Sequence, residues 1–168
     1  MPISQISNAG ISSTAAISTS KLGTGAVLQV LQATKTDTAS TTSTSFIDVT
    51  GLSISITPSS SSNKILVLVV LGSTPNATNA NKFNIVRNGT NIAQPDSGSN
   101  KSTINHFPGA NNNAEGTSAC WLDSPATTSA VTYKVQWCVD TATGYLNRHL
   151  SGTDYNSVSS ITVMEIAA

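Results

Sequence analysis

The sequence offers few side chains that could perform acid–base or nucleophilic chemistry at neutral pH. His106 and His149 are its two histidines, and histidine is the side chain whose ordinary pKa lies near neutrality. A nucleophilic pair would require Cys120 to meet one of them in the fold. No Gly-x-Ser-x-Gly, His-Glu-x-x-His or Lys-containing phosphate-binding loop occurs. We therefore expect no catalytic residues and no enzymatic activity.

The acidic residues are spaced too widely to predict a metal site. A hard cation needs several oxygen ligands from one loop, and no aspartate in the chain has another within four positions. The alternative is an ion held by His106 or His149 across a three-fold axis. We expect no metal and no cofactor, with aspartates such as Asp123 capping turns. Glu165, in a terminal strand, is expected to face solvent or a sheet edge.

Composition indicates a polar but nearly uncharged surface. Ser, Thr and Asn account for 64 of 168 residues, whereas charged residues make up 10% and the formal net charge is zero. An average soluble domain has roughly 25% charged residues. Nucleic-acid binding requires clustered Lys and Arg, so this composition excludes a nucleic-acid partner. It also argues against an electrostatic membrane anchor.

The chain shows no targeting or membrane segment. The longest apolar run, Ile65–Leu71, is far shorter than the ~20 residues of a membrane-spanning helix, so we expect no membrane insertion. The N-terminus lacks the basic start and apolar region of a signal peptide. The protein is therefore expected to be made in a cytoplasm. There Cys120 and Cys138 are expected to be buried, unpaired thiols, although the sequence leaves their pairing open.

Residues 1–23 differ from the rest of the chain. Single apolar residues stand among Ser, Thr, Ala and Asn without a heptad pattern, and such a segment cannot bury enough apolar surface to order by itself. We interpret residues 1–23 as an extended N-terminal arm that attaches to a partner, and residues 24–168 as one domain. The predicted attachment residues are Ile3, Ile6, Ile11, Ile17 and Leu22.

From Ala26 onward the pattern is that of β-strands separated by turns. Val131–Val139 alternates apolar and polar residues, and Asn88-Gly89 is typical of a type I′ hairpin turn. Lys64–Leu71 is apolar at successive positions, which predicts a central strand between two layers. The predicted strands are Ala26–Ala33, Phe46–Ile56, Lys64–Leu71, Phe83–Arg87, Thr90–Ala93, Thr103–Phe107, Thr117–Leu122, Val131–Val139, Gly144–Leu150 and Ser159–Ile166.

These short strands predict an all-β fold. We expect an antiparallel β-sandwich that is jelly-roll-like, with a barrel as the structural alternative. Most aromatic residues fit the core of such a domain, namely Phe46, Phe83, Trp121, Tyr133 and Trp137. Exposed tyrosines beside Asn and Arg could instead stack on a sugar. The candidate glycan contacts are Asn112, Tyr145 and Arg148.

Several segments of the domain resemble a module of bacteriophage virion proteins. They include Gly25–Val30, Ala33–Asp37, Ser43–Leu52, Ile56–Pro58, Ser62–Val67, Leu122–Pro125, Thr132–Gln136 and Ile161–Ile166. The module is found especially in phages of aquatic bacteria and cyanobacteria, where it is labelled tail fibre or virion structural. The resemblance covers residues 25–168 and implies a homotrimer on the particle surface. It implies no catalytic residues.

Two functions follow as expectations. Because only an arm of about 23 residues precedes the domain, without a coiled coil or shaft, we favour a trimeric knob that decorates or cements the capsid. Its partners would be copies of itself and the major capsid or another virion protein, and it would reside on the virion surface. The alternative is a tail-fibre tip, or receptor-binding module, that recognises host surface glycan. A small hydrolase or metalloenzyme is a third possibility, which an activity screen and metal analysis would reveal.

Overall fold

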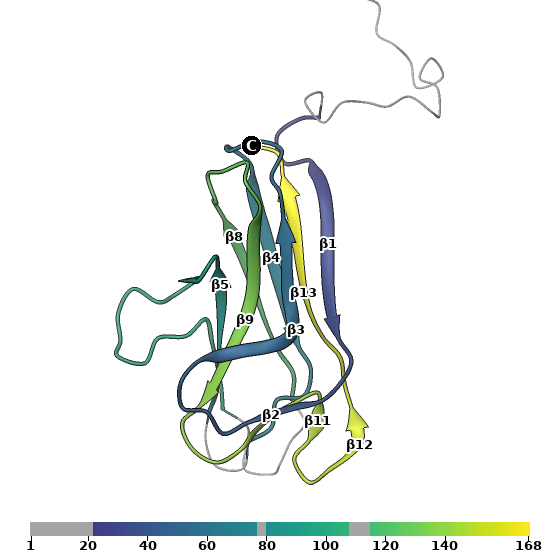
Figure 1. Ribbon diagram of the computed structural model, residues 1–168, viewed down its shortest axis with the longest axis vertical. Helices are drawn as coiled ribbons and strands as arrows, with labels where there is room; N and C mark the ends of the chain where they lie inside the picture. The colour runs from purple at the N-terminus through teal and green to yellow at the C-terminus, as the bar shows by residue number, and fades with distance from the viewer. Residues whose placement is uncertain (1–21, 77–79, 108–114) are drawn as a thin grey trace, which may run out of the picture.

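Two antiparallel sheets pack face to face in the computed structural model, which describes residues 22–76, 80–107 and 115–168 (Figure 1). Strands and turns account for all regular structure in these residues. The two main sheets are open, each with its own edge strands, so the fold is a β-sandwich and the barrel alternative is wrong. The attachment residues Ile3, Ile6, Ile11 and Ile17 lie outside the described residues.

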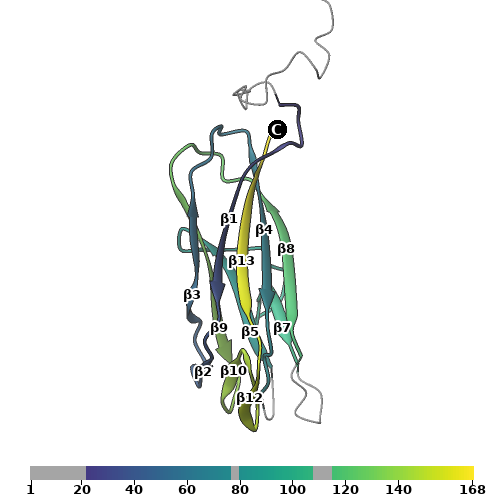
Figure 2. The same ribbon diagram turned by 90° about the vertical axis from the view of Figure 1, so that its right-hand side faces the viewer.

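The first sheet has four strands in the spatial order β1-β13-β4-β8, each antiparallel to its neighbours. Its strands are β1 (Val27–Lys35), β13 (Ser159–Ile166), β4 (Lys64–Leu71) and β8 (Thr117–Asp123). The C-terminal strand β13 therefore lies inside the sheet, whereas β1 and β8 form its two edges. Figure 2 shows these four strands side by side along the long axis of the molecule.

The second sheet has the order β3-β9-β5-β6, with β7 also paired to β5. Its strands are β3 (Ile47–Ile56), β9 (Val131–Val139), β5 (Asn81–Arg87), β6 (Thr90–Ile92) and β7 (Ile104–His106). The β5–β6 hairpin turns at Asn88-Gly89, where both residues have the positive φ angles (46° and 87°) of the predicted turn type. The Thr132 N–H donates a 2.8 Å hydrogen bond to Asn88 Oδ1, which fixes this turn against β9.

Two small two-stranded sheets complete the fold at one end of the sandwich. They pair β10 (Gly144–Leu146) with β2 (Ala39–Thr41), and β11 (Arg148–His149) with β12 (Gly152–Asn156). At the opposite end, the start of β1 and the C-terminus lie together, joined by Gly25 N–Ala167 O and Ala167 N–Ala26 O hydrogen bonds of 2.8 and 2.9 Å. Figures 1 and 2 show these two ends at the bottom and top of the molecule.

The core forms between the inward faces of the two main sheets. In β4 and β9 every second residue is buried, as period-2 alternation requires. Phe83 and Trp137 stack with ring centroids 6.1 Å apart, and Tyr133, further along β9, is fully buried. The buried cluster comprises Val49, Leu52, Ile56, Ile65, Val67, Val69, Leu71, Phe83, Ile85, Ile92, Val131, Tyr133, Val135, Trp137, Leu146, Ile161 and Val163.

The strand predictions from sequence are largely confirmed, and β4, β9 and β13 have the predicted bounds. The short strand β2 lies in a Thr/Ser stretch that was not predicted to form one. The predicted strand Gly144–Leu150 is instead divided between β10 and β11. The left-handed φ of Asn147 (61°) accounts for this break.

Three predictions about burial are wrong. β4 buries only one face, because its other face lies on the outside of the sandwich. Trp121 is 43% exposed because β8 is an edge strand, and Phe46 is only half-buried. Of the two cysteines, Cys138 is buried as predicted, but Cys120 points outward from β8 and is exposed. Both are free thiols.

Candidate interaction surfaces

An apolar outer face distinguishes the four-stranded sheet. The strand register places the following outward residues on it, which we call the apolar face: Val27, Val30, Leu66, Leu68, Val70, Cys120, Leu122, Met164 and Ile166. Val30, Leu122 and Val70 are 52%, 54% and 50% exposed. The sequence had indicated apolar residues on both faces of β4, but it did not show that one of those faces lies outside the core.

Register aligns the centre of this face into one continuous row. Val30 pairs with Met164, Met164 with Leu66, and Leu66 with Leu122, so four apolar side chains cross the whole width of the sheet. Directly opposite residues of paired strands have Cβ atoms about 5 Å apart, close enough for contact. The row is therefore one contiguous apolar strip.

Beside this strip the outer face mixes apolar and neutral polar residues. Gln32 donates a 2.8 Å hydrogen bond to Thr162 Oγ1, and in the next row the hydroxyl residues Thr34, Ser160 and Ser118 accompany Val70. Lys64, at the rim, is the one charged residue among the outward positions of these four strands, and its Nζ donates to Ser124 Oγ. With one charged residue per copy, and that one at the rim, such a surface has little like-charge repulsion for a second copy.

The outer face of the second sheet is polar by contrast. Lys134 Nζ and Gln136 Nε2 each donate a 2.7 Å hydrogen bond to the carboxylate of Asp48. This pairing holds the pKa of Asp48 below its usual value. Close by, the hydroxyls of Ser55 and Thr132 are 2.7 Å apart and hydrogen-bonded. The two outer faces of the sandwich thus differ in chemistry, and only that of the four-stranded sheet has an apolar strip.

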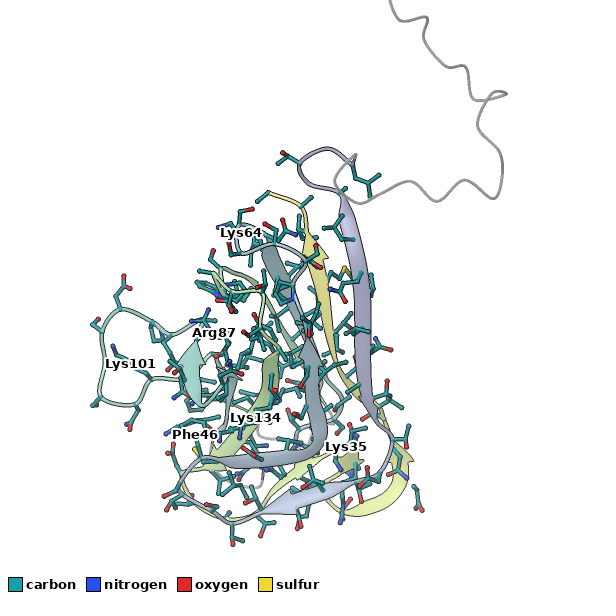
Figure 3. All side chains as sticks on the ribbon, turned by 45° about the horizontal axis from the view of Figure 1, so that its top comes forward. Lys35, Phe46, Lys64, Arg87, Lys101 and Lys134 are labelled. Atoms are coloured by element: carbon teal, nitrogen blue, oxygen red, sulfur yellow. The ribbon has the colours of Figure 1, made fainter. Side chains whose placement is uncertain are left out.

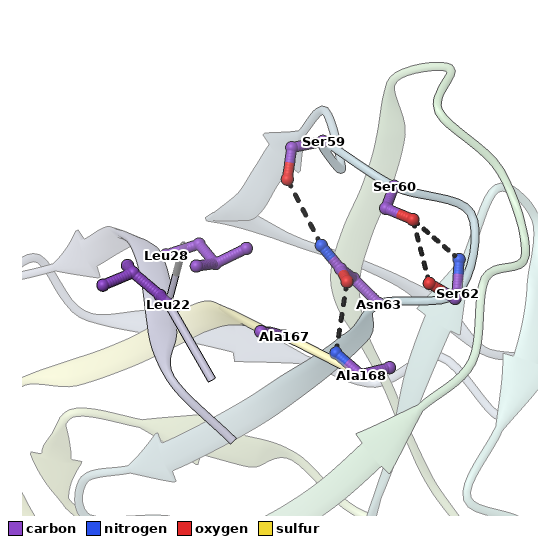
Figure 4. A pocket seen from close by; sticks show the side chains of 8 residues that line it. All are labelled: Leu22, Leu28, Ser59, Ser60, Ser62, Asn63, Ala167 and Ala168. Carbon is purple, nitrogen blue, oxygen red and sulfur yellow. Dashed lines mark hydrogen bonds between the residues drawn. The ribbon is translucent and has the colours of Figure 1, made fainter. Parts of the chain in front are cut away.

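The N-terminal end carries the one predicted attachment residue among the described residues. Leu22 is 42% exposed. It borders an open pocket of about 260 Å³ whose other lining residues are Leu28, Ser59, Ser60, Ser62, Asn63, Ala167 and Ala168 (Figure 4). This end of the sandwich therefore presents a surface that combines apolar and hydroxyl groups.

Glu165 anchors this end of the sandwich from inside, and the prediction that it faces solvent is wrong. It lies in the interior strand β13, is 1% exposed, and accepts hydrogen bonds from Gln29, Ser59 and Asn63. Burial alone would raise the pKa of Glu165, but these hydrogen bonds outweigh burial and hold the pKa below its usual value. The Asn63 side chain also accepts from the backbone N–H of Ala168, so one network joins β13, the β3–β4 turn and the C-terminus.

The far end brings together two of the predicted glycan contacts. The Arg148 guanidinium lies over the Tyr145 ring, 4.5 Å from its centroid. Between them in sequence, buried Asn147 donates to the carbonyls of Lys35 and Asp37 at 2.9 and 3.0 Å, which fixes the position of this turn. The third predicted contact, Asn112, lies outside the described residues.

The two histidines each hydrogen-bond to a neighbouring hydroxyl side chain. His106 Nδ1 hydrogen-bonds to Thr74 Oγ1, and its Nε2 lies 3.6 Å from Glu115. Burial lowers the pKa of His106, and the charge of Glu115 only partly opposes this. His149 Nδ1 hydrogen-bonds to Ser151. No group of three His, Cys, Asp or Glu side chains with the arrangement of a metal site occurs in the described ranges.

Asp123 is not simply a turn-capping residue, as the sequence had suggested. Its buried carboxylate accepts hydrogen bonds from Arg87 (2.8 and 2.9 Å) and from the Tyr133 hydroxyl (2.6 Å). Burial and this acceptor together raise the pKa of Tyr133 well above its usual range. Because Asp123 belongs to the first sheet and its partners to the second, the cluster links the two layers.

The basic side chains are dispersed over the molecule (Figure 3). Lys35, Lys82, Arg87 and Lys134 each pair with an aspartate, and Lys101 projects on the loop between β6 and β7. The described chain also contains no helix that is long and apolar enough to cross a membrane.

Compared with known proteins, the chain matches no protein-family model and no curated protein sequence.

Proposed function

We propose that this protein is a structural component of a bacteriophage virion surface, a homotrimeric knob that decorates or cements the capsid through its N-terminal arm. The observation that carries the proposal is the apolar face on an otherwise neutral, hydroxyl-rich sandwich. Contiguous exposed apolar patches mark interaction sites on soluble proteins. The sequence resemblance to virion proteins supports the same assignment.

The energetic reason for self-association is burial of these exposed side chains. Fully burying one Val or Leu side chain contributes about 1.5–3 kcal/mol, so covering the exposed half of Val30, Val70 or Leu122 contributes roughly 1 kcal/mol each. A closed cyclic assembly covers such a patch on every copy and leaves none to recruit further copies. A trimer therefore suits a particle protein that must not polymerise.

We further propose that the sandwich is a jelly roll. Successive main strands β1, β3, β4 and β5 alternate between the sheets, and after the β5–β6 hairpin the alternation resumes through β8, β9 and β13. Eight-stranded, double-sheet jelly rolls occur in viral capsid domains. The wrapping order thus agrees with a role on a particle surface.

Attachment is assigned to the arm, residues 1–23. Each isoleucine would occupy a small apolar pocket on the major capsid or another virion protein, at an entropic cost for ordering the segment. Three arms on one trimer bind with a high effective concentration, so weak single contacts sum to stable attachment. The protein would be made in the host cytoplasm and reside on the virion surface.

Removal of the arm tests this assignment. A chain lacking residues 1–23 should remain a folded trimer but lose binding to purified particles that lack the protein, as measured by co-sedimentation. Replacing Ile3, Ile6, Ile11 and Ile17 with Ser should have the same effect. The matched control replaces Ser4, Ser7, Ser12 and Ser18 with Ala and should bind normally. Undiminished binding of the truncated chain would exclude attachment through the arm.

The second candidate is a tail-fibre tip that recognises host surface glycan. It is favoured by the Tyr145–Arg148 pair, which lies at the end of the sandwich opposite Leu22 and the C-terminus. A tyrosine ring can stack on a sugar ring, and a guanidinium can donate hydrogen bonds to sugar hydroxyls. Binding on a glycan array that is lost in Tyr145→Ala would favour this function over capsid decoration.

A further inference from the structure

We propose that three copies of the chain join through the apolar face and both free edges of the four-stranded sheet, with β1 of one copy beside β8 of the next. The three-fold axis would run parallel to the strands, with the apolar faces turned toward it. This inference rests on the proposed homotrimer and names the surface that forms it.

The size of the face indicates that the edges must contribute. Eight residues per strand and four strands give a flat outline of about 26 by 19 Å, or roughly 500 Å². A stable interface buries about 800 Å² on each partner. The apolar face alone therefore falls short of a stable interface, and contact must extend onto neighbouring surface.

Both edges of this sheet carry the apolar residues that such an extension requires. On β1, Leu31 is exposed in addition to Val27 and Val30 of the apolar face, and on β8 Trp121 is exposed in addition to Leu122. Natural edge strands are usually protected from pairing by outward charges or proline. Here neither strand contains proline, and their only charged residues, Lys35 and Asp123, are buried.

Strand direction makes the two edges compatible. Within one copy, three successive antiparallel pairings separate β1 from β8, so these strands run in opposite directions. Rotation about an axis parallel to the strands preserves direction. Consequently β1 of one copy meets β8 of the next in antiparallel orientation, as a sheet continuation requires.

A second copy is the occupant best suited to this surface. The outward positions carry a single charge, that of Lys64, and the chain as a whole has zero formal net charge. Such a surface offers little to steer or select a charged partner, whereas identical neutral copies meet without repulsion. The β1 and β8 edges also complement one another in a head-to-tail ring, which the proposed homotrimer would close at three copies.

The arrangement determines which ends of the trimer meet other molecules. Because the axis parallels the strands, the start of β1 and the C-terminus of all three copies lie at one end (Figure 1). The three Tyr145–Arg148 pairs then lie together at the opposite end. One end of the knob would thus face the shell, and the other would face outward.

Thiol reactivity tests the interface in the unmodified protein. Cys120 is exposed on the apolar face of the isolated chain, whereas Cys138 is buried and serves as an internal control. We expect a protein with trimer mass in which Cys120 reacts with a thiol reagent at least tenfold more slowly than in a monomeric variant. A trimer with freely reactive Cys120 would overturn the proposed surface and leave the homotrimer intact. A monomer in solution would overturn both the proposed surface and the homotrimer. The same holds for a monomer whose Cys120 becomes protected only on particles, because another virion protein would then cover the apolar face.

Matched substitutions test the face and its edges. Val30→Lys with Leu122→Lys should give a folded monomer by circular dichroism and sedimentation, whereas Ser55→Lys with Thr132→Lys, on the polar face, should leave the trimer intact.

A cross-linking experiment tests the edges. Val30→Cys should cross-link to Cys120 of the next copy and yield covalent trimers. The cross-linker is a bismaleimide too short to join β1 and β8 within one chain. Three strand spacings separate those two strands by about 14 Å. Ser55→Cys should yield none, and equal cross-linking in both variants would overturn the edge contact even if the lysine variant fails to fold.

Discussion

Glu165 illustrates how single side chains stabilise this nearly uncharged domain. A buried carboxylate is costly unless hydrogen bonds replace its water, and here Gln29, Ser59 and Asn63 supply them at 2.6 to 2.8 Å. Two separate segments of the chain, β1 and the turn between β3 and β4, thereby converge on one residue of β13. The network closes the end of the sandwich where the start of β1 and the C-terminus lie together.

Substitution of Glu165 should therefore reduce stability. In Glu165→Gln, one acceptor oxygen becomes an NH₂ group that faces donors, and the charge-assisted hydrogen bonds are lost. We expect the free energy of unfolding to fall by about 2 kcal/mol, measured by chemical denaturation. Asp154→Asn, at an exposed position of β12, is the matched control and should be nearly neutral. Equal stability of the two variants would show that the network contributes little.

The same carboxylate predicts a pH dependence. Its pKa is lower in the folded than in the unfolded chain, where the usual value is 4.5. The folded state therefore binds fewer protons in this range, so the stabilisation is present above pH 4.5 and is lost as the pH falls through the folded-state pKa. Stability of the unmodified protein should decline more steeply below pH 4.5 than that of Glu165→Gln. Parallel acid profiles would contradict this assignment.

Among the elements, the β5–β6 hairpin depends most clearly on local sequence. Gly89 has φ 87° with no atom within 4 Å of an added Cβ, so its requirement for glycine is conformational and not steric. Gly89→Ala should lower the free energy of unfolding by about 1 kcal/mol. Gly23→Ala, also in open space but without a positive φ, is the control and should have little effect. Calorimetric melting of both variants checks the difference.

The elements that could be predicted from sequence are those with a pattern among adjacent residues, either apolar–polar alternation or a turn dipeptide. Val131–Val139 and the Asn88-Gly89 turn were found because alternation and turn chemistry are properties of adjacent residues. What could not be predicted is which face of a strand the partner sheet covers. β4 has apolar residues on both faces, and only pairing with β13 and β8 shows that one face lies outside.

The candidate surfaces were predicted less completely than the strands, for the same reason. Tyr145 and Arg148 were named together from their proximity in sequence, and the structure stacks them. The apolar face went unrecognised because its central row joins Val30, Leu66, Leu122 and Met164, which are distant in sequence and meet only through strand register. No local pattern signals that alignment.

At the scale of the whole molecule, the two faces and two ends of the sandwich divide the proposed tasks. The polar face of the second sheet is suited to solvent, and the apolar face of the first to other copies. The start of β1 and the C-terminus lie at one end, and the Tyr145–Arg148 turn occupies the other. Such a polarity is useful to a protein fixed on a surface, because attachment and outward exposure then involve separate residues.

The central claim is that the chain acts by assembling with copies of itself on a virus particle. The most direct test is to locate and count it in purified virions by cryo-electron microscopy and quantitative mass spectrometry. The account predicts three-fold clusters on the outer surface, at hundreds of copies on the head for capsid decoration or a few on the tail for a fibre tip. Absence of the chain from virions, or its presence as isolated single copies, would contradict the account.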